Sequence, residues 1–146
     1  MHETIAGLQA ILNAVPTQLH SITETKAGVA SSPEGWSKKE ILGHLIDSAN
    51  NNHQRFVRAQ IEAELVAPKY EQEAWVSAQV YREESWSSLI EFWESYNRHI
   101  LHVMSRVPES KLPTRCLIGD NEPVTLKFLM QDYVDHMKHH LEQILA

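Results

Sequence analysis

The sequence predicts an all-α protein, an antiparallel four-helix bundle with a long crossover between its second and third helices. Apolar residues recur every three or four positions in four long segments, as helices that face a common core require. The stretch between the second and third segments is long enough to cross a bundle. At 146 residues the chain has the commonest size of one domain, so we expect a single domain over residues 1–146.

The first predicted helix covers residues 3–27. Its apolar positions are Ile5, Leu8, Leu12, Val15, Leu19 and Ile22. Pro16 falls within this pattern and removes one backbone donor, so we expect the helix to bend there.

The second predicted helix covers residues 37–64, and its start is the best specified of the four. Ser37 can cap the helix, Glu40 can return the hydrogen bond from the third helical position, and Trp36 can pack onto Ile41. The stretch VAPKYEQEAWVSAQVYREE follows it, and we expect a crossover that holds a short helix around Trp75.

The last two predicted helices cover residues 85–107 and 125–145. The apolar stripe of the third helix is Leu89, Trp93, Tyr96, Ile100, Val103 and Val107. The stripe of the fourth is Leu126, Met130, Tyr133, Met137, Leu141 and Ile144. The stretch LPTRCLIGDNEPVT lies between them, and its prolines, its Gly-Asp-Asn turn and its flanking β-favouring residues predict a loop or a small hairpin.

Charge and composition argue against several classes of partner. The net charge is −6 and no cluster of Lys and Arg is present, so we expect neither nucleic acid nor an anionic lipid surface as a partner. No apolar run is long enough to cross a bilayer, and we expect no membrane segment. The single cysteine, Cys116, and the absence of an evident export signal predict a cytoplasmic location.

Three of the nine histidines lie in the string HMKHH of the last segment. With a step of about 100° per residue, His140 lies about 40° and His136 about 80° from the centre of the apolar stripe, whereas His139 lies about 140° away. His136 and His140 therefore border the core, and His139 faces water. Histidines four residues apart can bind one metal ion, but such a pair is frequent by chance, and a solvated or hydrogen-bonded pair is the alternative.

A polar band on the second helix offers a third ligand. The band runs along one edge of the apolar stripe and consists of His44, Ser48, Asn51 and Arg55. The outward side of the helix already carries Asp47, Gln54 and Arg58. We therefore interpret the band as the polar wall of an internal cleft, with an ordinary solvent face as the alternative.

The remaining histidines have no evident partners. We expect surface positions for the five others, which are His2, His20, His53, His99 and His102. Asp47 and Asp135 could orient a ligand imidazole, but their helix positions place both mostly outward.

Three segments resemble the DinB-like family of metal-binding four-helix-bundle proteins, which includes thiol-dependent S-transferases. These segments are GWSKKEILGHLIDSANNNHQRF, YEQEAW and VTLKFLMQDYVDHMKHHLEQI, and the resemblance runs from about residue 3 to the end. In that family one histidine of the second helix and two of the last bind a divalent ion, which implies His44, His136 and His140 as ligands here. The resemblance also implies zinc, nickel or iron as the metal, open coordination sites, and a homodimer.

Three neutral imidazoles would leave a divalent ion with its full charge and an open position, which is typical of catalytic sites. A low-molecular-weight thiol bound there would become a thiolate that attacks an electrophile, whereas bound water would hydrolyse an ester or amide. Ser48, Asn51 and Arg55 could hold a polar end of a small-molecule substrate, and Glu73 could act as an extra base. The sequence assigns no catalytic residue. Thiol transfer is the favoured hypothesis, with a hydrolase or a non-catalytic binding module as alternatives.

Overall fold

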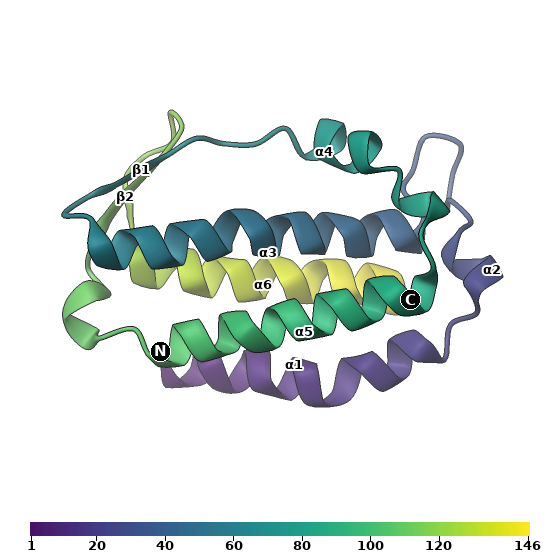
Figure 1. The fold of residues 1–146 in the computed structure, drawn as a ribbon, viewed down its shortest axis with the longest axis horizontal. Helices are drawn as coiled ribbons and strands as arrows, with labels where there is room; N and C mark the ends of the chain where they lie inside the picture. The colour runs from purple at the N-terminus through teal and green to yellow at the C-terminus, as the bar shows by residue number, and fades with distance from the viewer.

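Four long helices run side by side in the computed structural model, which describes residues 1–146 (Figure 1). They are α1 (His2–His20), α3 (Lys38–Ile61), α5 (Trp86–Ser105) and α6 (Leu126–Leu145). α6 runs antiparallel to α3 and α1 antiparallel to α5, whereas α3 and α5 run in the same direction (Figure 1). The predicted four-helix bundle is confirmed.

The chain between α3 and α5 returns along the outside of α3 (Figure 1). This crossover contains β1 (Leu65–Ala67), the short helix α4 (Gln72–Gln79) and the 3-10 helix η1 (Tyr81–Glu83). The prediction of a long crossover with a short helix around Trp75 is therefore confirmed. The crossover brings the chain back to the end where α3 starts, and for this reason α3 and α5 are parallel.

Side-chain caps fix the starts of three long helices where the sequence predicts them. The Ser37 hydroxyl accepts a hydrogen bond from the Glu40 amide at 3.2 Å, and the Glu40 carboxylate accepts one from the Ser37 amide at 2.9 Å. This reciprocal pair satisfies two amides that have no partner inside the helix. Ser85 caps α5 and Thr125 caps α6 in the simpler way, each accepting from the amide three residues on.

The first predicted helix is shorter than expected. It ends at His20 instead of residue 27, and a separate short helix, α2 (Glu24–Ala27), follows it. Thr23 has an extended backbone and its hydroxyl caps α2, accepting from the Lys26 amide at 3.2 Å. A capped second helix competes here with continuation of the first. Pro16 lies inside α1 without interrupting it.

The second predicted helix ends at Ile61 instead of residue 64, because the next residues enter a three-stranded sheet. In this sheet β1 pairs in parallel with β2 (Arg115–Ile118), and β2 pairs antiparallel with β3 (Val124–Thr125). The antiparallel pair is the hairpin that the sequence predicts. The parallel strand β1 is not predicted by the sequence, because its partner β2 lies about fifty residues further along the chain.

The four helices share one apolar core, to which residues of every long helix contribute. All six predicted stripe residues of α6 are buried, as are Phe56 of α3 and Trp93 of α5. None of the helices combines the length and the apolar character that a bilayer crossing needs.

Candidate metal centre

Three histidines from two antiparallel helices converge on one point. His44 comes from α3, and His136 and His140 come from successive turns of α6. The Nε2 atoms of His44 and His136 lie 3.1 Å apart, and the ring centres of His136 and His140 are separated by 4.5 Å. One nitrogen of each imidazole lies within 4.8 Å of the other two. The structure therefore brings together the three residues that the sequence singles out.

The spacing of these nitrogens fits a single divalent ion. Two imidazole nitrogens at about 2.0–2.1 Å from one ion, with tetrahedral or octahedral angles, lie roughly 2.8–3.4 Å apart. The separation of 3.1 Å between His44 Nε2 and His136 Nε2 falls in this range. The donor set is all nitrogen, which suits zinc, nickel, iron and copper.

Burial keeps two imidazoles of the cluster, those of His44 and His136, neutral. His44 is fully buried, and desolvation together with the neighbouring imidazoles lowers its pKa to about 3. Desolvation and its neighbours lower the pKa of His136 to about 4. A metal ligand must offer an unprotonated nitrogen, so these two residues are in the required state at neutral pH.

Packing against Trp36 and the contact with His136 orient His44. Its Nδ1 atom is buried without a hydrogen-bond partner, and its ring lies 5.1 Å from the ring of Trp36. Nε2, which faces His136, is thus the nitrogen of His44 that is placed to hold an ion.

A glutamine orients the third imidazole. His140 Nδ1 lies 2.9 Å from Gln143 Oε1, and because an amide oxygen can only accept, Nδ1 carries the proton. The Nε2 lone pair of His140 is then free for a ligand, in the manner of partners that fix metal-binding histidines. Sequence reasoning missed Gln143, although its position three residues after His140 on one helix face is a usable signal.

His139 lies outside the cluster, as its helix angle predicts. It is exposed, and its Nε2 atom lies 3.3 Å from Gln143 Nε2. Its ring centre lies 5.2 Å from that of His140, but it is not one of the three residues whose nitrogens converge.

The predicted substrate-binding residues make internal hydrogen bonds. Ser48 is buried and accepts from Asn52 Nδ2 through its carbonyl at 2.9 Å, and Asn51 donates to a carbonyl one turn back on its own helix. Arg55 donates to the Pro68 carbonyl at 3.2 Å. None of the three predicted residues lines the cavity of about 770 Å³ described below, and substrate binding by them stays a prediction.

Asp47 is buried, contrary to the outward position predicted for it. It is 2% exposed, and its Oδ1 atom accepts from Tyr81 Oη and from Gln79 Nε2, each at 2.7 Å. The crossover covers this side of α3, which a helix-angle estimate cannot include. Gly43 permits the cover, because a Cβ atom there would lie 2.2 Å from the Tyr81 ring. Burial raises the pKa of Asp47.

His53 also differs from its predicted surface position. It is half-buried, its Nδ1 lies 3.0 Å from Tyr96 Oη, and its ring centre lies 5.2 Å from that of His99. The other four histidines expected at the surface are exposed, and so is Asp135.

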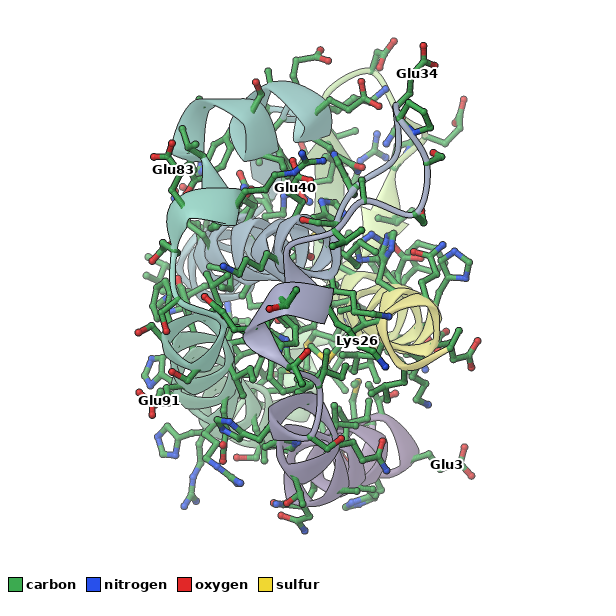
Figure 2. The ribbon with its side chains drawn as sticks, turned by 90° about the vertical axis from the view of Figure 1, so that its right-hand side faces the viewer. Glu3, Lys26, Glu34, Glu40, Glu83 and Glu91 are labelled. Carbon is green, nitrogen blue, oxygen red and sulfur yellow. The ribbon has the colours of Figure 1, made fainter.

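A cavity of about 770 Å³ opens beside the histidine cluster. It is lined by Trp36, which contacts His44, and by Gln143, which holds His140. Figure 2 looks onto this end of the bundle and shows Lys26 on α2 and Glu34 in the loop before α3, both of which line the cavity. A cavity of this size accommodates a small molecule.

Comparison with known proteins shows the family to which this four-helix bundle belongs. Residues 7–144 match the DinB superfamily, and the chain belongs to it. The sequence is 21% identical over 144 residues to OB0413 of Oceanobacillus iheyensis, provisionally named a metal-dependent hydrolase, and the match covers 99% of this chain and 83% of OB0413.

Solved structures with the same fold carry different activities. YfiT from Bacillus subtilis, described as a probable metal-dependent hydrolase, is 20% identical with a TM-score of 0.82, and the match covers 99% of this chain and 85% of YfiT. A mycothiol-dependent maleylpyruvate isomerase is 14% identical with a TM-score of 0.80, over 99% of this chain and 60% of the isomerase. At these identities the likeness shows the fold, and the cluster together with the metal-dependent relatives indicates a divalent metal.

Proposed function

We propose that this protein is a divalent-metal-dependent enzyme that transfers a low-molecular-weight thiol to an electrophilic small molecule. In this proposal His44, His136 and His140 hold the ion. The observation that carries it is the separation of 3.1 Å between His44 Nε2 and His136 Nε2, in a cluster of three imidazoles beside a cavity of about 770 Å³. The metal-dependent and thiol-dependent relatives support it.

The protein side chains prepare the site for this chemistry. When bound, the ion supplies a positive charge with open coordination positions, at which a thiol or a water molecule is acidic enough to act as a nucleophile at neutral pH. Gln143 holds His140 with its Nε2 lone pair free, and Trp36 covers His44 on the cavity side. The all-imidazole set adds no negative charge that would weaken the ion as an acid.

The absence of a carboxylate in the cluster favours a thiol over water. None of the three imidazoles makes a hydrogen bond to an acidic side chain. A thiol, whose ordinary pKa is about 8.5, is closer to losing its proton at neutral pH than water is, so it depends less on a general base within hydrogen-bond reach. Hydrolysis is the second candidate, because Glu73 lines the cavity next to Trp36 and could act as that base.

Metal content after purification tests the ligand assignment. We expect one ion per chain in the unmodified protein and strongly reduced metal in His44→Ala, His136→Ala and His140→Ala, because each loses one nitrogen ligand. His139→Ala is the matched control and should keep its metal, since this exposed residue lies outside the cluster. Stoichiometric metal in both His44→Ala and His140→Ala, or its loss in His139→Ala alone, would contradict the assignment.

Conjugation of a thiol to monochlorobimane tests the reaction. Metal-loaded protein should accelerate the conjugation of at least one low-molecular-weight thiol, and His44→Ala should lose most of this rate. The same preparations should be assayed on activated esters, with Glu73→Gln as the variant that separates the two reactions. Ester hydrolysis that depends on Glu73, without conjugation, would favour the hydrolase, and turnover of neither kind would favour a binding module.

A further inference from the structure

The cavity beside the histidine cluster carries opposite charges at its two sides. Glu73 of α4 lines the cavity and also an adjoining one of about 230 Å³ beneath α4 and η1, which Trp36 shares. Lys26 of α2 lines the cavity and also a different neighbour of about 340 Å³ next to Ile144 at the end of α6. The acid therefore lies on the crossover side and the base on the side of α2 and α6.

These charges have no partners within the protein. Lys26 Nζ, Glu34 and Glu73 take part in none of the salt bridges or side-chain hydrogen bonds of the chain, whereas Lys38 donates to the Ile144 carbonyl at the end of α6. Figure 2 places Glu34 at the top of this end of the molecule and Lys26 near its middle, with α4 also at the top. Glu34 and the helix that carries Glu73 thus lie above Lys26 in this view.

An aromatic wall lies on the side of Glu73, because Trp36 lines both cavities that Glu73 lines. Trp36 lines the cavity and also contacts His44, so the wall reaches from the cavity to the histidine cluster. The face of an indole attracts a cation, and Glu73 shares the adjoining cavity with this ring. An ammonium group therefore fits best on the side of Glu73 and Trp36, and an anion fits best at Lys26.

We propose that the cavity binds small zwitterions of the amino-acid type, with the ammonium group toward Glu73 and Glu34 and the carboxylate toward Lys26. This inference deepens the proposed function and rests on it for the thiol. The thiol of the transfer reaction is then a cysteine-type compound that carries both a free ammonium group and a carboxylate. Thiols that lack either charge are poorer ligands.

Thioether probes separate binding from reaction, because a thioether cannot be transferred. S-methylcysteine carries both charges, N-acetyl-S-methylcysteine only the carboxylate, and 2-(methylthio)ethylamine only the ammonium group. Binding of each to metal-free protein is measured by NMR titration, which suits a chain of 16.7 kDa and weak ligands. We expect S-methylcysteine to bind more tightly than either singly charged probe, with the largest shifts at Trp36 and its neighbours.

Two charge-removing variants provide the decisive comparison. Lys26→Gln should weaken the binding of S-methylcysteine and of N-acetyl-S-methylcysteine about two- to fivefold, as expected for exposed charge pairs, and leave 2-(methylthio)ethylamine unaffected. Glu73→Gln should weaken the binding of S-methylcysteine and of 2-(methylthio)ethylamine and leave N-acetyl-S-methylcysteine unaffected. Glu109→Gln, an exposed acid outside the cavity, is the matched control and should change none of the three. Lys26 and Glu73 are both exposed, so their variants should fold.

The results distinguish this inference from the proposed function. Zwitterion-selective binding without conjugation of any thiol would overturn the transferase and leave the cavity assignment intact. Conjugation with no preference for doubly charged thiols, or no saturable binding of S-methylcysteine, would overturn the cavity assignment alone. The same selectivity in Lys26→Gln, Glu73→Gln and the unmodified protein would also overturn it.

Discussion

At His44 the geometry of the candidate metal site lowers the stability of the fold. This residue is fully buried, and its Nδ1 has no hydrogen-bond partner. A buried polar group without a partner costs about 1–3 kcal/mol. Its Nε2 is satisfied by His136 in the absence of an ion, but only one of these two nitrogens can then carry the shared proton. A bound ion would accept both Nε2 lone pairs, but His44 Nδ1 would stay protonated and without a partner, so the cost of its burial would remain.

The buried histidines predict a pH dependence for the metal-free protein. The folded-state pKa of His44, about 3, lies below its unfolded value of about 6.5, so the unfolded chain takes up a proton first as the pH falls. The stability from the neutral form is therefore present above pH 6.5 and is lost below it. Between pH 6.5 and 5.5, His44 alone should lower the free energy of unfolding by about 1 kcal/mol. Urea denaturation with a chelator measures this.

A pair of variants isolates this effect. In His44→Gln the decrease between pH 6.5 and 5.5 should be smaller by about the amount assigned to His44. His20→Gln removes an exposed histidine of α1 and should leave the decrease unchanged. Equal pH slopes in the unmodified protein and His44→Gln would show that burial of His44 does not control its protonation.

At the residue scale, helix angles predict which side chains approach the core but not what covers them. They place His136 and His140 beside the core and His139 in water, and the structure agrees. They fail for Asp47, because a segment more than thirty residues away supplies Tyr81 and Gln79 as its partners. Contacts made by a distant segment of the chain leave no periodic signal in the sequence of the helix that this segment covers.

At the scale of single elements, a strained residue joins α4 to η1 in the crossover. Val80 has φ 51° and ψ 51°, the left-handed region, which a β-branched side chain rarely adopts. It lies between Gln79 and Tyr81, the two residues that donate to Asp47. The left-handed turn at Val80 thus stands between the two residues that hold the crossover against α3 through Asp47.

Replacing Val80 should relieve that strain. Asn tolerates the left-handed conformation far better than Val does, and Val80 is 48% exposed, so little packing is lost. We expect Val80→Asn to stabilise the protein by about 1 kcal/mol, which corresponds to roughly 2–4 °C in melting temperature. Differential scanning calorimetry measures the change.

The matched control is Val66→Asn in β1. Val66 is 61% exposed like Val80, but its backbone does not have a positive φ. Asn is unfavourable in a strand, so this variant should be neutral or less stable. A lower melting temperature for Val80→Asn would show that the Val80 side chain stabilises the crossover more than its backbone strains it.

Sequence patterns predict these elements where their signals are local. The Ser37 cap, the Ser85 cap and the Thr125 cap each lie within four residues of their partners, and the three helix starts are predicted to within one residue. β1 depends instead on pairing of Leu65 with Cys116, and a three-residue strand has no periodicity of its own. The sequence therefore places its residues in the crossover that follows a helix predicted to end at residue 64.

At the scale of the whole molecule, the candidate site and the core occupy the same helices but not the same residues. α3 and α6 each present apolar side chains to the core, and each carries its histidines along the edge of that apolar face. The site thus lies between two helices that the core already holds in place. This arrangement predicts that the ion is needed for activity and not for folding.

Removal of the metal tests that prediction. A chain of this size with four apolar stripes buries about two thirds of its unfolded surface, which is enough for a stable core without an ion. Chelation should therefore leave the far-UV circular dichroism at 25 °C nearly unchanged while it abolishes thiol conjugation or ester hydrolysis. The melting temperature should rise with free metal in the unmodified protein, because an ion bound only to the folded state stabilises it by mass action, and not in His44→Ala. A metal-free protein that is unfolded at 25 °C would show that the ion is structural, and the case for an open catalytic site would lose its main physical support.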